Sequence, residues 1–374
     1  MKRVLLITDI FPPHIGGPAT FIDHLARRIS ALGHRATVVC SSDNHTEPSD
    51  KDRPFKVRRI TGDRVARYIK TPPIILKEML SHRNILVNGH ENVACRMAQL
   101  AGRDYVLKVV GDVVWEAARN LGWTDLDIDR FQREAPVTGP IAGLQARRQR
   151  FVQRARLIIT PSDYLRQMVI GWGKAPDAVV TVANGVDQDE YAGFEATRRT
   201  GDVLEVVFVG RLTNWKGVET LLLAVERLPR ARVTIIGDGP ELPHLKELSA
   251  QLTLTEKVRF TGRLDRASMK SAMAGCHVLV LASLYEGLSH TLLEAMSMGI
   301  PCIASGVGGN PEVITHDADG LLVQPQHVDE LRESLASLER DEPSRFRLAQ
   351  GAREKARRFD LKETAEKTLE LVVV

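Results

Sequence analysis

A strand–helix alternation that runs through the first half of this 374-residue chain and then restarts in the second half constrains its fold most. Between the first two strands, Phe21, Leu25 and Ile29 recur at helical spacing. Strands that alternate with helices pair in parallel and are covered by helices. The sequence therefore predicts an α/β protein with two Rossmann-like, doubly wound domains and a cleft between them. The strands are predicted at residues 2–8, 36–40, 85–87, 105–110 and 157–160, then at 205–209, 232–236, 257–261, 278–281 and 301–304.

The boundary between the two series is predicted in the polar stretch of residues 193–201, which has no apolar periodicity. We therefore place an N-terminal domain at residues 1–196 and a C-terminal domain at residues 197–357. A last helix, in residues 358–374, is predicted after Phe359, where Asp360 and Glu363 resemble a capping box. Its apolar stripe consists of Leu361, Ala365, Leu369 and Val372.

Composition favours a cytoplasmic enzyme. No apolar run approaches the roughly 20 residues that span a bilayer, and the N-terminal run is too short for a signal peptide. The cysteines are scattered, without a C-x-x-C pair, which indicates thiols in a reducing compartment. They are Cys40, Cys95, Cys276 and Cys302.

Positive charge is concentrated in two runs of the first half. Residues 51–70 contain eight Lys or Arg and two Asp, and residues 147–156 contain five Arg and no acid. Each run alone favours a solvated surface. The functional alternative is a cationic face for an anionic acceptor, or for peripheral contact with the inner face of a membrane. No nucleic acid partner is expected, because aromatic residues do not interleave with the charges.

Two cations in the second half suit a diphosphate. Arg211 follows a strand and Lys216 precedes a helix, so together with free helix N–H groups they could neutralise two phosphates. The alternative is two solvated surface cations. Gly237 and Gly239 form a turn after the next strand, which is either a plain turn or one that lets a ligand approach the backbone.

Glu286 and Glu294 lie eight residues apart, one after the strand at 278–281 and the other about two turns into the following helix. In open α/β sheets, ligands bind at this edge. One carboxylate could accept ribose hydroxyls, and the other could hold sugar hydroxyls or face a cationic transition state. The alternative for each is a charge placed favourably on the helix dipole.

The chain resembles family 4 of the retaining glycosyltransferases, which have the GT-B fold. The resemblance covers nearly the whole chain, and the E-x7-E element is its specific part. It rests on Gly16-Gly17, Asn184-Gly185-Val186-Asp187, Gly210-Arg211 with Lys216-Gly217, Gly237-Asp-Gly239-Pro240, the glutamate pair, and Gly308-Gly309-Asn310-Pro311-Glu312.

The resemblance implies a function: transfer of a hexose from a UDP- or GDP-sugar to a hydroxyl of a glycan, lipid-linked or small-molecule acceptor. It also implies no metal or cofactor, and a last helix that crosses back to the N-terminal domain. By resemblance, Arg211 and Lys216 bind the diphosphate, Glu286 the donor sugar and Glu294 the ribose. The implied donor contacts also include Gly16, Gly17, Gly237, Gly239, Arg263, Leu264 and the backbone N–H groups of Leu288, Ser289, His290 and Thr291.

One departure concerns Gly111, which stands where the family commonly has a histidine. Either Asp112 contacts the sugar or the acceptor, or no side chain does. His90, after an earlier strand, either reaches the cleft or bonds to backbone. Two alternative functions stay open: a sugar-nucleotide 2-epimerase of the same architecture, and a non-catalytic nucleotide-sugar binding protein.

Asp125, Asp127 and Asp129 match the D-x-D metal motif of the other glycosyltransferase fold. That motif needs the end of an apolar strand, whereas this one follows Gly-Trp-Thr and precedes Arg-Phe-Gln. A capped helix start is the better interpretation, so no metal ligand is predicted.

Overall fold

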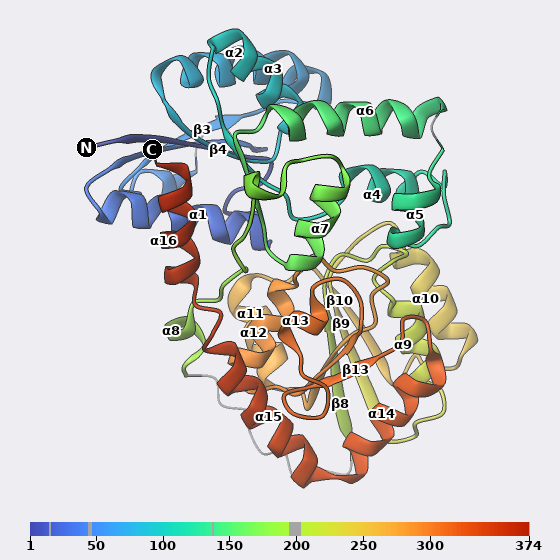
Figure 1. Ribbon diagram of the computed structural model, residues 1–374. Coiled ribbons are helices and arrows are strands. Elements are labelled where there is room, and N and C mark those ends of the chain that lie inside the picture. The colour runs from blue at the N-terminus through green and yellow to red at the C-terminus, as the bar shows by residue number, and fades with distance from the viewer. Residues whose placement is uncertain (15, 44–46, 137, 194–202, 374) are drawn as a thin grey trace. The chain divides into compact units, whose positions relative to one another are not determined.

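The computed structural model of the chain describes all residues except 15, 44–46, 137, 194–202 and 374 (Figure 1). The described residues form two compact units. The first contains residues 1–114, 135–183 and 361–374, and the second contains residues 115–134 and 184–360. The expected boundary at residue 196 falls outside the described residues.

The first unit is built on a parallel sheet of seven strands in the order β3-β2-β1-β4-β5-β6-β7. The sheet is doubly wound, because the order reverses direction between β1 and β4. Its strands are β1 (Arg3–Thr8), β2 (Arg35–Ser41), β3 (Lys56–Ile60), β4 (Asn84–Asn88), β5 (Val106–Lys108), β6 (Leu157–Thr160) and β7 (Val179–Thr181). Its helices are α1 (Gly17–Ala31), α2 (Arg64–Ser81), α3 (Glu91–Ala101), α6 (Gly139–Arg154), α7 (Asp163–Gly171) and α16 (Leu361–Val372), with 3-10 turns at Pro48–Asp50 and Pro176–Ala178.

The last helix of the chain, α16, completes the core of this first unit. It lies beside α1 (Figure 1). Its apolar stripe joins the α1 side chains, alternate residues of β1 and β2, and Leu86 of β4 in one buried cluster. Arg28 on α1 pairs with Glu366 on α16. The expected return of the C-terminal helix to the N-terminal domain is confirmed.

The second unit has a parallel sheet of six strands in the order β10-β9-β8-β11-β12-β13, and here the order reverses direction between β8 and β11. Its strands are β8 (Leu204–Val209), β9 (Ala231–Ile236), β10 (Val258–Gly262), β11 (Val278–Leu281), β12 (Cys302–Ser305) and β13 (Leu321–Val323). Its helices are α5 (Ile128–Glu134), α8 (Gln188–Tyr191), α9 (Val218–Val225), α10 (Leu242–Gln251), α11 (Arg266–Ala274), α12 (His290–Ser297), α13 (Asn310–Val313), α14 (Val328–Arg340) and α15 (Glu342–Ala356), and α4 (Val113–Asn120) enters it from the first unit.

Every strand that the sequence predicts is present, and the two parallel sheets confirm the predicted fold class. Three strands that the sequence did not indicate are also present: β3, β7 and β13. All three lie at the edge of a sheet. The four cysteines are free thiols, and none of the described helices is both long and apolar enough to cross a bilayer.

Candidate active site

The predicted cation–carboxylate site lies where the second sheet reverses direction. Lys216 follows β8 and Glu286 follows β11, the two strands that flank the reversal. Lys216 Nζ donates a hydrogen bond of 2.7 Å to Glu286 Oε1. Ser283 Oγ donates to the same oxygen, also at 2.7 Å. The structure thus brings together two of the predicted catalytic residues, at the edge where open α/β sheets bind ligands.

The backbone of Glu286 is held by the loop after β12. Gly309 N–H donates to Glu286 O at 2.9 Å. Gly308 has a φ of 57°, and a Cβ there would lie 1.9 Å from the same carbonyl oxygen. Only glycine allows this approach without a shift of the backbone. The Gly308-Gly309 pair therefore fixes the loop that presents the carboxylate.

Three aromatic rings pack together in and between the loops that carry Lys216 and Glu286. Trp215 and Tyr285 each precede one of the two charged residues in sequence. The ring of Trp115 lies 5.5 Å from Trp215 and 5.4 Å from Tyr285, measured between ring centres. Trp115 is fully buried, and Leu284 N–H donates to Trp215 O at 2.7 Å. The two loops that carry the pair are therefore joined by both packing and a hydrogen bond.

Gly237 and Gly239 pack against the loop that leads to Lys216. A Cβ at these positions would lie 1.9 Å from Gly210 O and 2.2 Å from Leu212 O. Leu212 N–H donates to Asp238 O at 3.0 Å. Both glycines are thus required by close contact between the loops after β8 and β9, and their predicted donor contacts stay a prediction.

The N-terminus of α12 lies between the two predicted glutamates in sequence. Ser289 caps it, because its side chain accepts from Leu292 N–H at 3.3 Å. Asn184 Nδ2 donates to Leu288 O at 2.9 Å and holds the preceding turn. Amide groups in the first turn of a helix have no acceptor within the helix, so this end suits an anion. Leu288 is buried, and Ser289, His290 and Thr291 are partly exposed.

Glu294 has surroundings different from those of Glu286. Its Oε1 lies 3.8 Å from Arg266 Nη2. Burial raises the pKa of Glu294, against the opposing charge of Arg266. Arg266 also donates two hydrogen bonds of 2.6 Å to Glu190, and Lys270 donates a third at 2.8 Å. Burial alone would raise the pKa of Glu190, but these hydrogen bonds lower it to about 2.

The remaining predicted donor residues are more exposed. Arg211, in the loop after β8, is exposed, and none of the described carboxylates pairs with it. Arg263 Nε lies 3.5 Å from Asp238 Oδ2, and its side chain is also exposed. Leu264 is half-buried beside it. The Arg211 guanidinium, in the same loop as Lys216, is thus available to a phosphate.

Asp112 lies in the first unit and is fully buried. Its Oδ2 accepts from Arg148 Nη1 at 2.6 Å, and its Oδ1 accepts from Val114 N–H at 2.9 Å. The Arg148 guanidinium stacks 4.0 Å from the Trp172 ring centre. The carboxylate thus has a structural role, while its predicted catalytic role has no support from these contacts and stays a prediction.

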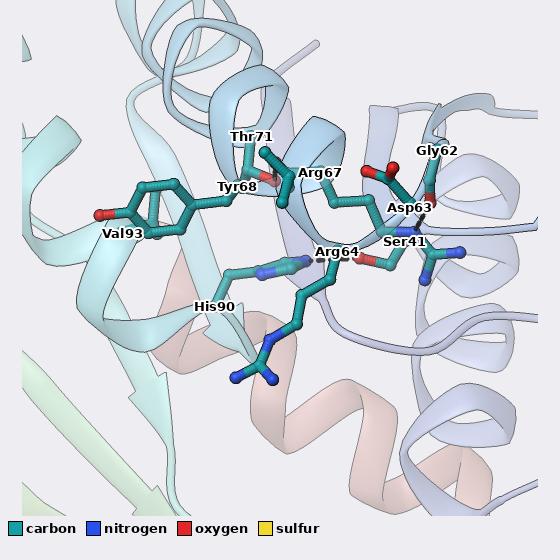
Figure 2. Close-up of a pocket in the computed structure, with 10 residues that line it drawn as sticks. Ser41, Gly62, Asp63, Arg64, Arg67, Tyr68, Thr71, His90 and Val93 are labelled. Atoms are coloured by element: carbon teal, nitrogen blue, oxygen red, sulfur yellow. Dashed lines mark hydrogen bonds between the residues drawn. The ribbon is translucent and has the colours of Figure 1, made fainter.

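His90 follows β4 and is bonded to side chains. Its Nδ1 lies 3.2 Å from Asp9 Oδ1, and its Nε2 lies 3.1 Å from Ser41 Oγ (Figure 2). The His90 N–H also donates to Asp9 Oδ1, at 3.0 Å. Gly16 and Gly17 begin α1 in the same unit.

The D-x-D segment is a helix start, as predicted. Asp127 Oδ1 accepts from Arg130 N–H at 2.8 Å at the beginning of α5. In the part of the chain that the structure describes, no group of three or more His, Cys, Asp or Glu could hold a metal ion.

Two family models match consecutive parts of the chain. Glycosyltransferase Family 4 matches residues 15–190, and Glycosyl transferases group 1 matches residues 193–355. The chain belongs to family 4 of the glycosyltransferases. It is therefore an enzyme of the glycosyltransferase class, and its two parallel-sheet units are those of the GT-B fold.

Two relatives from Mycobacterium tuberculosis are similar to this glycosyltransferase over most of their length. A GDP-mannose-dependent alpha-(1-6)-phosphatidylinositol monomannoside mannosyltransferase is 26% identical over 363 residues, which cover 90% of this chain and 89% of the relative. A glycogen synthase is 25% identical over 384 residues, covering 94% and 90%. Anabaena HepE, solved in complex with UDP and glucose, has a TM-score of 0.81, 20% identity and 99% coverage of both chains.

Several residues around these sites were not predicted from the glycosyltransferase sequence. Asp9 could have been predicted as a site residue, because it is the first acid after the first strand. The carboxyl ends of parallel strands share one edge of the sheet. Trp215 and Tyr285 could also have been predicted, because each is next to a predicted site residue in the sequence. No sequence feature indicated Trp115, because it lies 100 residues before Trp215 in the chain.

Proposed function

We propose that this glycosyltransferase moves a hexose from a UDP- or GDP-sugar to an acceptor hydroxyl with retention of the anomeric configuration. The hydrogen-bonded Lys216–Glu286 pair at the reversal of the second sheet supports the proposal most. UDP in HepE and GDP-mannose in the name of the mycobacterial relative support a nucleoside diphosphate donor.

In the proposed reaction, the bond between sugar C1 and the diphosphate oxygen breaks on the same face where the acceptor oxygen bonds to C1. The acceptor proton goes to a diphosphate oxygen. Lys216, Arg211 and the α12 amides stabilise the leaving charge, so no metal or other cofactor is needed. Glu286 holds the sugar, and Glu294 holds the ribose. Without donor, Lys216 neutralises Glu286; with donor, Lys216 shifts its interaction to the phosphate.

The acceptor in this proposal is a glycan, a lipid-linked sugar or a small molecule. One relative is named for a lipid-linked acceptor and another for a polysaccharide, and the two names together support this range of acceptors. The enzyme works in the cytoplasm, with peripheral contact to the inner face of a membrane through its basic first unit. Lys51, Arg64 and Lys70 support that contact, since none of them pairs with a described carboxylate.

The first test is donor turnover by Lys216→Ala and Glu286→Gln variants of the purified enzyme. Loss of one preorganised donor to the leaving group lowers kcat by about 100- to 1000-fold, and we expect that loss for Lys216→Ala. Lys246→Ala is the matched control, because Lys246 is exposed on α10 in the same unit. Turnover by Lys216→Ala at the control rate contradicts the site assignment.

Thermal shift with UDP, GDP, ADP and their sugars identifies the donor, since a ligand of the native state raises its stability by RT ln(1 + [L]/Kd). The same samples separate the alternative functions. An epimer formed from the donor without any acceptor indicates a 2-epimerase. Tight diphosphate binding with no turnover of any sugar nucleotide indicates a binding protein.

A further inference from the structure

Glu294, the predicted ribose contact, belongs to a network of charged side chains within the second unit. Two basic residues and two carboxylates meet there: Arg266 and Lys270 on α11, Glu190 on α8 and Glu294 on α12. The ring centre of Tyr191 on α8 lies 5.2 Å from Lys270 Nζ. The reaction proposed above uses only Glu294 of these five residues, so it does not account for the other four.

The start of α11 brings both basic residues to the same side of the helix. Asp265 caps this helix, because its Oδ1 accepts from Ser268 N–H at 2.9 Å. Arg266 is then the first residue of the helix and Lys270 lies four residues later, and residues four apart share one face of a helix. Both side chains therefore reach Glu190, which lies 76 residues before Arg266 in the chain.

Arg266 contacts the two carboxylates unequally. Its Nε and Nη2 donate to the two oxygens of Glu190 at 2.6 Å each, which is the bidentate geometry of a strong ion pair. Its Nη2 lies 3.8 Å from Glu294 Oε1, which is too far for a hydrogen bond. Arg266 therefore stabilises the charge of Glu294 and leaves the lone pairs of that carboxylate to other donors.

A ribose needs these lone pairs. The two neighbouring hydroxyls of a ribose can both donate to an ionised carboxylate, whereas a protonated carboxyl group has fewer acceptor sites. The Glu294 side chain is 13% exposed, so a ligand can reach it. A guanidinium bonded to both Glu294 oxygens would compete with the ribose for them. The bidentate pair with Glu190 holds the Arg266 guanidinium back from that position.

The ionisation of Glu294 depends on the same network. Burial raises the pKa of Glu294, and the charges of Arg266 and Lys270 act against that rise. On the α8 side, a hydrogen bond from Tyr191 also acts to lower this pKa, whereas the charge of Glu190 acts to raise it. The other elements that pack closely on α12 are β11, β12 and α15, whose buried residues are apolar apart from Cys302 and Ser305.

We propose that Glu190 and Arg266 are positioning residues for the donor ribose: Glu190 holds Arg266 where it stabilises ionised Glu294 without occupying the oxygens that accept the ribose hydroxyls. The inference rests on the proposed function, in which Glu294 holds the ribose, and adds two positioning residues to that contact. Without the Glu190 charge, the guanidinium turns to Glu294 and blocks the ribose. Without the guanidinium, burial favours protonated Glu294.

The test compares each nucleoside diphosphate with its 2′-deoxy form by calorimetry: UDP with dUDP, and GDP with dGDP. The ratio of the two Kd values reports the ribose contact, because the contributions of base and phosphates cancel. A hydrogen bond to a charged group gives a factor of about 10 to 100, so the wild type should prefer the ribose form by about that factor. Glu190→Gln should bring the ratio close to parity at every pH. Glu247→Gln, at an exposed position of α10, is the matched control.

Arg266→Gln should act differently, because it removes a charge that favours ionised Glu294. The substitution raises the pKa of Glu294 further, so the preference for the ribose form should be lost at a higher pH than in the wild type and return at alkaline pH. Arg227→Gln, an exposed arginine of the same unit, should keep the wild-type profile. A loss of fold stability alone would leave both ratios unchanged, because the two ligands are measured on the same sample.

A wild-type ratio in Glu190→Gln, a wild-type pH profile in Arg266→Gln, or a wild type without preference for the ribose form overturns the proposal. Each of these results, obtained with wild-type protein that binds UDP or GDP, leaves the proposed function standing. If the wild type binds neither diphosphate, the proposed function fails and this inference fails with it.

Discussion

At the residue scale, Lys108 is an amine enclosed by the core of the first unit. It is 3% exposed, its Nζ lies 3.6 Å from the Phe21 ring centre, and no described atom accepts a hydrogen bond from it. Burial lowers its pKa from 10.5 to about 7. Between these two values the unfolded chain binds more protons than the native one, so stability rises with pH, by at most about 1.4 kcal/mol per pH unit.

We therefore predict that Lys108→Met stabilises the enzyme at pH 7 and removes most of this rise between pH 7 and pH 10. Urea unfolding across that range measures both effects. Lys77→Met, at an exposed position of α2, is the control and should keep the wild-type slope. An unchanged slope in Lys108→Met would mean that Lys108 stays charged in the fold.

At the element scale, residues 115–134 belong to the second unit although the chain before and after them belongs to the first. Trp115 anchors this segment against Trp215 and Tyr285. We predict that Trp115→Ala lowers stability by about 3–5 kcal/mol, the usual cost of truncating a buried aromatic. Transfer activity should fall as well, because the loops of Lys216 and Glu286 lose their common support.

Differential scanning fluorimetry and donor turnover check this prediction, with Trp115→Phe expected to lie between wild type and Trp115→Ala. Trp123→Ala is the control in the same segment, since Trp123 is 44% exposed. If Trp115→Ala and Trp123→Ala lowered stability and turnover equally, the effect would come from the segment in general and not from the aromatic packing of Trp115.

Strand position explains how much of the fold could be predicted. Central strands such as β11 are apolar throughout, because helices cover both faces. Edge strand β3 reads Lys-Val-Arg-Arg-Ile and is half-exposed, so its composition is that of a charged loop. Strands β7 and β13 have three residues each, which is too short for a periodic signal.

The candidate site could be predicted where charged residues lie in the loop that follows a strand. Lys216 and Glu286 each lie in a loop after a strongly apolar strand, and a resemblance to known motifs supported them. The partner of Asp112 was not predictable, because Arg148 lies 36 residues later and meets it through tertiary packing. For a similar reason, the sequence does not show which arginines of residues 51–70 form ion pairs and which, like Arg64, do not.

At the scale of the whole molecule, the first unit depends on the end of the chain. Leu361, Ala365, Leu369 and Val372 of α16 are buried in its core. We predict that Leu369→Ala lowers stability by about 2–5 kcal/mol, and that a chain ending at Phe359 fails to keep the first unit folded. Proteolysis and circular dichroism measure both, with Glu370→Ala as the exposed control on the same helix. A soluble, protease-resistant truncated chain would contradict the dependence.

The place of α16 in the first sheet's core has a consequence for synthesis. A ribosome adds roughly 5–20 residues per second. After Ala183 has been made, 374 − 183 = 191 further residues must follow, which takes about 10–40 s at that rate. Throughout this time the apolar surface of β1, β2 and α1 that α16 later covers stays exposed. The second half of the protein is translated in full before the first half can close, so this nascent chain is a natural client for chaperones that shield apolar surface.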